Sequence, residues 1–187
     1  MSSHHIVREK QEPALYIHRL GNFDEEYLGQ LLEWSPSLLV NSSEYDKIIS
    51  LGLKVDIVVN PLPSYGFQEN TKLIDTGSSD MDSVLEYLIS EGYPAVNLID
   101  ATADLHSLEN YISRINIVVF TETHKAYAIK SGFKVWKPAG MQFSIVTADE
   151  FSYTNLLPLE AGGFEVAHDG FVSFTFNYPY LFISEAL

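Results

Sequence analysis

The sequence predicts an α/β fold with two domains, a mostly parallel α/β domain over residues 1–130 and a small antiparallel β domain over residues 131–187. Two observations support this prediction. In the first part, short apolar runs alternate with segments whose apolar residues recur at helical spacing, which is typical of a parallel sheet with helical crossovers. In the second part, short aromatic and β-branched runs are separated by glycine or proline, as in antiparallel hairpins.

The predicted strands of the first domain are apolar runs that end at turn-forming residues. They cover residues 14–18, 38–40, 55–59, 72–75, 95–99 and 115–120. The third strand is followed by Asn60-Pro-Leu-Pro-Ser64, which forms a rigid turn because proline fixes its own backbone angle. Strands that alternate with helices in this way are Rossmann-like and imply right-handed crossovers.

Helices are predicted between these strands from helical spacing and from the residues that can cap them. The last of these helices is expected over residues 107–112. The capping candidates of the earlier ones are Asn22 or Asp24, Ser42 or Ser43, and Ser79.

The carboxyl ends of the strands are the expected place for a ligand. In an open parallel sheet, ligands bind there, at the point where the strand order reverses. The loops of interest therefore begin at Asn41, Asn60, Asp75 and Asp100.

The second domain is predicted to be of the β-sandwich type. Its strands are expected over residues 133–136, 143–147, 164–166, 171–176 and 180–183. A domain this small cannot bury all of its aromatic residues between its own faces, and exposed aromatic patches commonly mark interfaces. We therefore expect this domain to contribute to a dimer contact.

Charge and composition exclude several classes of function. The formal net charge is −14 and the basic residues are scattered, which argues against nucleic-acid binding. The chain has no cysteine, so thiolate catalysis and thiolate-bound zinc are excluded. No apolar run is long enough for a membrane helix, and the first residues do not form a secretory signal, so we expect no membrane partner and a cytoplasmic location.

Several segments carry a resemblance to the thiamine pyrophosphokinase family. In that family the motifs A-D-G-G-A, P-D-x-x-x-G-D-F-D-S, T-D and G-x-R-x-D-H-x-x-x-N follow one another. Segments at compatible spacing stand in the same order here, and the opening residues are similar to Bacteroidetes members. The four segments are Val40-Asn-Ser-Ser-Glu44, residues 55–64, residues 79–88 and His106-Ser-Leu-Glu-Asn110.

This resemblance implies an activity and a set of site residues. The family transfers a diphosphoryl group from ATP to the hydroxyl of thiamine, uses magnesium, and works as a homodimer with active sites between subunits. By position, Asp80 would be the catalytic and metal-binding residue if the chain is active. The candidates for binding substrate or nucleotide are Asn41, Ser64, Ser79, His106 and Asn110.

A second interpretation of these residues stays open. Asp80 lies in the first turn of a predicted helix, where a negative charge is favourable whatever the function. His106 and Asn110 are four residues apart on the helix expected there, so they can simply hydrogen-bond each other or the backbone.

The sequence departs from the family motifs at the charged positions. Diphosphoryl transfer needs carboxylates to hold magnesium and cations to neutralise the phosphates. Asn41 replaces the first aspartate, Pro61 and Pro63 replace the next two, and Leu105 replaces the one before His106. Serines also replace both glycines of the first motif, and the expected arginine is missing from the last one.

These departures predict a non-catalytic or much weakened paralogue that keeps the fold and the dimer and has a binding or regulatory role. The alternative is an active thiamine pyrophosphokinase with a rearranged site. Magnesium and ATP are implied as cofactors by the resemblance alone, and a chain that uses neither is the other possibility. Thiamine or a nucleotide is the expected small-molecule partner, and the protein partner is a second copy or an active relative.

Overall fold

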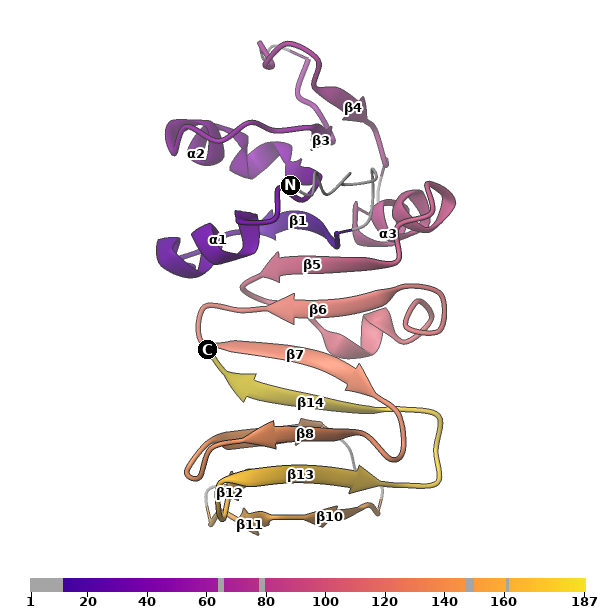
Figure 1. The fold of residues 1–187 in the computed structure, drawn as a ribbon. Helices are drawn as coiled ribbons and strands as arrows, with labels where there is room; N and C mark the ends of the chain where they lie inside the picture. The colour runs from indigo at the N-terminus through magenta and orange to yellow at the C-terminus, as the bar shows by residue number, and fades with distance from the viewer. Residues whose placement is uncertain (1–11, 64–65, 78–79, 147–149, 161) are drawn as a thin grey trace, which may run out of the picture. The chain divides into compact units, whose positions relative to one another are not determined.

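The structure is a computed structural model that describes residues 12–63, 66–77, 80–146, 150–160 and 162–187 (Figure 1). The chain divides into two compact units, Met1–Glu122 and Thr123–Leu187. The division falls at Glu122, so the segment 123–130, placed in the first domain by the sequence, belongs to the second unit. Within the described ranges, no helix is both long and apolar enough to cross a membrane.

The first unit contains a parallel sheet, as the alternating sequence pattern predicts. Every strand pair in it is parallel, and the strand order is β6-β5-β1-β2-β3-β4. The order reverses between β1 and β5, because the chain builds outward from β1 to β4 and then returns to the other side of β1. The strands are β1 (Ala14–Arg19), β2 (Leu38–Asn41), β3 (Ile57–Val59), β4 (Lys72–Ile74), β5 (Ala95–Asp100) and β6 (Asn116–Phe120).

The core of the first unit lies between this sheet and its connecting segments. In α3 (Asp80–Ser90) the apolar residues Val84, Leu85 and Leu88 recur at helical spacing and are buried against the sheet residues Tyr16 and Leu98. Apolar strands with few polar interruptions are expected when both faces of a parallel sheet are covered. The remaining helical elements are α1 (Glu25–Leu32), α2 (Tyr45–Ser50) and the 3₁₀ helices η1 (Ser42–Glu44) and η2 (Leu105–Leu108).

The capping predictions have mixed outcomes. Asp24 caps α1, since its side chain accepts from the backbone N–H groups of Glu26 and Tyr27 at 2.9 and 3.0 Å. The prediction that Ser42 or Ser43 caps the second helix is wrong: Asn41 caps η1, and α2 follows it without a side-chain cap. Asparagine and serine are both common N-cap residues, so the sequence alone could not separate Asn41 from the serines that follow it. Ser79 lies outside the described residues.

The expected helix over 107–112 is also wrong. The chain forms the 3₁₀ helix η2 over Leu105–Leu108 and then turns. Asp104 causes the early start, because its carboxylate accepts from the N–H of His106 at 3.0 Å and its carbonyl accepts from the N–H of Ser107 at 3.2 Å. This three-residue bond spacing is that of a 3₁₀ helix, which rarely extends far.

The second unit is antiparallel throughout its described strand pairs (Figure 1). One sheet has the order β11-β12-β9-β14-β7 and the other has the order β10-β13-β8. The strands are β7 (His124–Ile129), β8 (Lys134–Lys137), β9 (Gln142–Val146), β10 (Ser152–Thr154), β11 (Leu156–Pro158), β12 (Phe164–Val166), β13 (Gly170–Thr175) and β14 (Leu181–Ala186). Of these, β7, β10 and β11 were not predicted.

A buried acidic residue links the two sheets of the second unit. Glu185 on β14 accepts a 2.7 Å hydrogen bond from the Tyr127 hydroxyl and forms an ion pair with Lys137 on β8. Burial, followed by the hydrogen bond to Glu185, raises the pKa of Tyr127 above its ordinary value. Aromatic residues fill the space around this pair, and Phe143 meets Phe174 edge to face with centroids 6.1 Å apart.

We predict that Lys137→Met destabilises the protein by about 3 kcal/mol or more, because it leaves the Glu185 carboxylate buried without its close cation. Lys125→Met is the matched control, since Lys125 approaches the same carboxylate only to 3.9 Å and is more exposed. Its cost should stay below about 1 kcal/mol. Urea unfolding of both variants measures the difference, and equal losses would contradict the structural role of the Lys137–Glu185 pair.

A second prediction concerns the turn before β12. Gly162 and Gly163 both have positive φ angles, 91° and 85°. A Cβ at Gly163 would lie 2.7 Å from the backbone carbonyl oxygen of Phe143, whereas a Cβ at Gly162 would meet nothing within 4 Å. Both alanine variants bear the backbone strain of about 1 kcal/mol, but Gly163→Ala also displaces β9. Its melting temperature should fall clearly below that of Gly162→Ala, and the reverse order would be inconsistent with this packing.

Candidate functional site

A polar pocket lies at the carboxyl ends of β1 and β5, where the strand order of the first unit reverses. This is the place at which ligands bind in open parallel sheets. Its volume is about 170 Å³. The described residues that line it are His18, Arg19, Met81, Leu98, Asp100, Thr102, Ala103, Asp104, Ser107 and Leu108.

Arg19 and Asp100 form the central interaction of this pocket. The Arg19 Nε and Nη2 atoms donate to the two carboxylate oxygens of Asp100 at 2.8 and 3.0 Å. The Asp100 side chain is only 2% exposed, while half of the Arg19 side chain is exposed. The backbone N–H of Thr102 adds a third hydrogen bond to Asp100 at 3.0 Å. The hydrogen bond with Asp100 raises the pKa of Arg19, so the guanidinium is held as a cation.

The loop after β1 is fixed by contacts from several elements. Lys47 of α2 donates from Nζ to the Gly21 carbonyl at 2.5 Å, and Glu122 accepts from the Asn22 N–H at 2.8 Å. Gly21 has a φ angle of 58°, and a Cβ there would lie 3.2 Å from the Ala101 Cβ. The loop therefore packs closely against the chain after β5, and it keeps Arg19 beside Asp100.

The polar residues Asn41, at the end of β2, and Asn60, just after β3, hydrogen-bond residues of the loops at this edge. Asn41 is buried, and its Oδ1 atom accepts from the backbone N–H and the hydroxyl of Ser43 at 3.1 and 2.9 Å. Asn60 has a φ angle of 53°, and its Oδ1 atom accepts from the N–H and hydroxyl of Thr76 at 2.8 and 2.9 Å. Both amide oxygens thus shape loops.

His106 and Asn110 do not come together in the way the predicted helix required. Both are exposed, and the Nδ1 atom of His106 lies 2.8 Å from a carboxylate oxygen of Glu109. This hydrogen bond raises the pKa of His106. Among the described residues that line the pocket, neither His106 nor Asn110 nor Asn41 occurs.

The other predicted site residues cannot be placed in the same way. Ser64 and Ser79 lie outside the described residues. Asp80 is the first residue of α3, and its side chain lies outside what the structure describes. Its neighbour Met81 lines the pocket.

The residues that matter most in the pocket, Arg19 and Asp100, were not among the predicted site residues. Asp100 was predicted only as the first residue of a loop of interest, and no basic residue was predicted in these loops. Arg19 was overlooked because it ends β1, a strand whose following loop carried no motif. Each is the last residue of a buried strand, and a charged residue at that position could have indicated a site at the carboxyl edge of the sheet.

The described donors do not fit a magnesium site. Magnesium is held by carboxylates that are free to meet it, with water completing the octahedron. Both oxygens of Asp100 are already bound by Arg19, and a carboxylate oxygen of Asp75 accepts from the Gly77 N–H at 3.1 Å. In the described part of the chain, no group of three or more His, Cys, Asp or Glu residues could hold a metal ion.

Comparison with known proteins identifies the class of fold. No protein-family model matches the sequence, and no curated protein matches it. Solved structures do: a parallel α/β unit followed by an antiparallel β unit is the fold of the thiamine pyrophosphokinases.

Individual structures make the likeness specific. The thiamine pyrophosphokinase from Bacillus subtilis aligns with a TM-score of 0.72 and 12% identity, over 92% of this chain and 98% of that one. The Geobacillus thermodenitrificans enzyme aligns with a TM-score of 0.67 and 13% identity, over 93% of this chain and 97% of that one. The yeast enzyme aligns with a TM-score of 0.67 and 9% identity, over 97% of this chain and 88% of that one. The chain therefore has this fold, at an identity too low to carry the activity with it.

We predict that Arg19→Met destabilises the first unit by about 3 kcal/mol, because the buried Asp100 carboxylate loses its cation. The matched control is Arg114→Met, which breaks an Arg114–Glu86 pair that is also two-pronged, at 2.5 and 2.7 Å, but exposed on both sides. That loss should stay within about 1 kcal/mol. Chemical unfolding provides the comparison, and a control as damaging as Arg19→Met would refute the special role of Asp100.

Proposed function

We propose that this chain is a thiamine pyrophosphokinase-like protein in which diphosphoryl transfer is absent or much weakened, and that it acts by binding a small molecule. The observation that carries the proposal is the Arg19–Asp100 pair. The buried carboxylate at the carboxyl end of β5 is neutralised by a cation from β1, so neither charge is available at full strength for a metal or for a phosphate.

The other polar groups at this edge support the same conclusion. Diphosphoryl transfer from ATP needs cationic groups that stabilise the charge developing on the phosphates in the transition state. Such groups are most effective when the fold already holds them in place. Asn41 and Asn60 use their side-chain oxygens to hold Ser43 and Thr76. Lys47 is directed to the Gly21 carbonyl. The described edge is thus organised for its own stability rather than for a triphosphate.

The pocket between β1 and β5 nevertheless has the character of a binding site. Arg19 keeps an exposed edge of its guanidinium, Thr102 and Ser107 add hydroxyl groups, and Met81, Leu98 and Leu108 form an apolar floor. A volume of about 170 Å³ suits part of a small ligand rather than a whole nucleotide. Thiamine, or the ring end of a nucleotide, is the first candidate because of the fold.

An active enzyme with a rearranged site is the second candidate. Nearly the whole length of the Bacillus subtilis enzyme aligns with this chain, with 98% of that enzyme covered. Asp80 would then be the residue that holds the metal and supports the transfer. If the chain is an active enzyme, diphosphoryl transfer depends on Asp80. If it is a binding protein, diphosphoryl transfer is absent or much weakened.

Incubation of the purified protein with ATP, magnesium and thiamine tests the proposal. We expect formation of AMP and thiamine diphosphate to be several orders of magnitude slower than the roughly 1–100 turnovers per second of typical kinases. The Bacillus subtilis enzyme, assayed in parallel, controls for conditions. Turnover above about 1 per second, abolished by Asp80→Asn, would establish the active alternative instead.

A further inference from the structure

Arg19 uses only part of its hydrogen-bonding capacity on Asp100. That pair engages the Nε atom and one N–H of Nη2. A guanidinium carries five N–H donors, so the edge formed by Nη1 and the other N–H of Nη2 lies outside the pair. Half of the side chain is exposed, and the residue lines the polar pocket. This second edge has the fork geometry that binds a carboxylate through two parallel hydrogen bonds.

Asp104 brings a carboxylate to the same pocket from a different element. It caps η2, where its Oδ1 atom accepts from the N–H of His106 at 3.0 Å. Its other carboxylate oxygen accepts no hydrogen bond from the described part of the chain. An oxygen of this kind can accept from an ammonium group, and a charge-assisted bond of that type is stronger than a neutral one.

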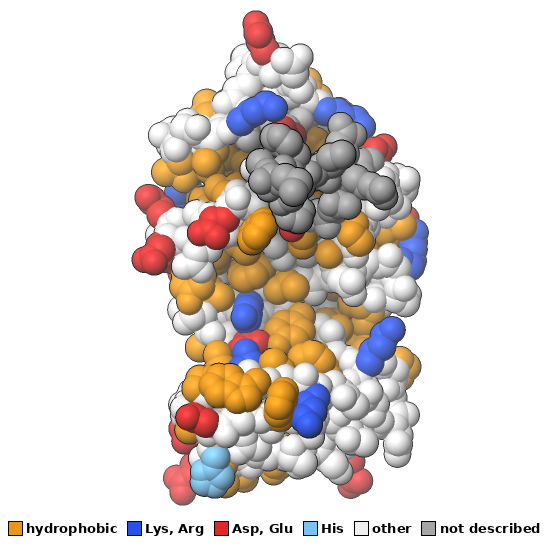
Figure 2. Space-filling view, viewed as in Figure 1, with side chains coloured by type: hydrophobic (Ala, Val, Ile, Leu, Met, Phe, Trp, Pro, Cys, Tyr) orange, Lys and Arg blue, Asp and Glu red, His pale blue; other side chains and the backbone are white. Residues whose placement is uncertain are grey.

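The charges of the lining favour a ligand that carries both signs. With histidine neutral, Asp100 and Asp104 outnumber Arg19, so a second carboxylate bound to Arg19 adds to an excess of negative charge. The net charge of −14 opposes anions at longer range as well. The described Lys and Arg side chains drawn in Figure 2 are spread over the visible face and do not form one patch. A carboxylate is therefore accepted only when its own molecule supplies a cation.

The size and the apolar part of the pocket limit the ligand further. The volume of about 170 Å³ is below the roughly 300 Å³ at which pockets for larger ligands begin. Leu98 and Leu108 are buried and line the pocket together with Met81. An α-amino acid places an ammonium and a carboxylate on one carbon atom, and a small aliphatic side chain can cover this apolar floor.

We propose that the polar pocket binds a small apolar α-amino acid. The ligand carboxylate binds the second edge of Arg19, the ammonium donates to Asp104, and the side chain lies on Leu98 and Leu108. This inference rests on the proposed function, because it takes the polar pocket as the ligand site. It names the ligand from the charges of the pocket rather than from the fold. Thiamine carries a cation but no carboxylate, so it would leave the second edge of Arg19 unused.

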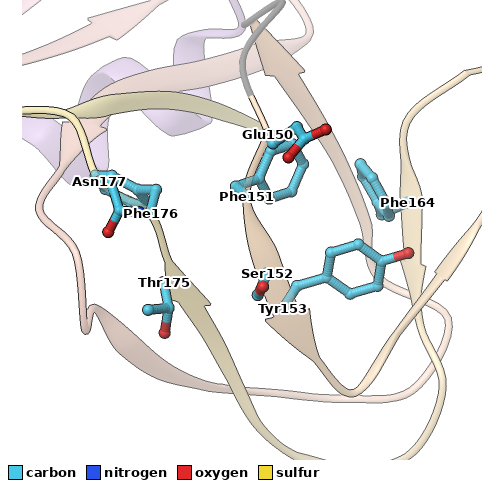
Figure 3. Close-up of a pocket in the computed structure, with 8 residues that line it drawn as sticks. All are labelled: Glu150, Phe151, Ser152, Tyr153, Phe164, Thr175, Phe176 and Asn177. Carbon is cyan, nitrogen blue, oxygen red and sulfur yellow. The ribbon is translucent and has the colours of Figure 1, made fainter.

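A larger pocket in the second unit provides an internal comparison (Figure 3). Its volume is about 540 Å³, and Tyr153 and Phe164 form an aromatic wall with their rings edge to face at 4.8 Å. Glu150 is the one charged residue among its described lining. This pocket offers a carboxylate without a cation, so we do not expect it to select a zwitterion.

Calorimetric titration with L-valine and two analogues tests the ligand class. 3-Methylbutanoate is valine without its ammonium group, and isobutylamine is valine without its carboxylate. We expect saturable binding of L-valine, and binding at least about tenfold weaker for each analogue, because each loses one charge-assisted contact. An absence of saturable valine binding, or an analogue that binds as tightly as valine, would overturn the proposal.

The variant Asp104→Asn tests the site without removing a helix cap, since asparagine caps as well as aspartate. It should weaken L-valine at least about tenfold and leave 3-methylbutanoate no weaker, because only the ammonium contact is lost. Asp24→Asn is the matched control, since Asp24 caps α1 outside the pocket. Glu150→Gln controls for the larger pocket. Valine affinity that survives Asp104→Asn, or that falls in Glu150→Gln, would show that the ligand does not bind as proposed.

These measurements can be separated from the assay of diphosphoryl transfer. Rapid formation of AMP and thiamine diphosphate would refute the proposed function, whatever the result with valine. Absence of turnover, together with binding of thiamine and none of L-valine, would leave the proposed function in place and refute the amino-acid site alone.

Discussion

The ion pair between Arg19 and Asp100 is the interaction on which the first unit depends. It joins the ends of β1 and β5, the two strands between which the sheet reverses its order. The Asp100 carboxylate is buried, so it requires a partner of opposite charge, and removing Arg19 would leave a carboxylate that water hardly reaches. The loops after β1 and β5 are fixed around this pair, and they form the walls of the polar pocket.

The core of the first unit and its polar edge are built from different residues. The parallel sheet is held by apolar strand residues and by α3, and the described residues of this core cluster are all hydrophobic. At the carboxyl edge, Asn41 and Asn60 accept from backbone and hydroxyl donors that a phosphate-binding loop would leave for its ligand. The stability of the core therefore does not depend on the side chains that shape the polar edge.

The second unit follows a different principle. Its sheets are short and its core is aromatic, with the Glu185–Lys137 pair inside it, so a large share of its aromatic surface remains outside. Trp136 and Phe171 are exposed because β8 and β13 lie in a three-stranded sheet that is covered on one face only.

The sequence by itself determined the alternation of strands and helices, the change to hairpins, and local features such as the Asp24 cap, because each depends on neighbouring residues. Only the tertiary structure decided the site. Arg19 and Asp100 are 81 residues apart, and Lys137 and Glu185 are 48 apart. Such pairs depend on which strands become neighbours, and no local periodicity encodes that. For the same reason β10 was missed, since all of its residues are exposed and its pairing with β13 alone makes it a strand.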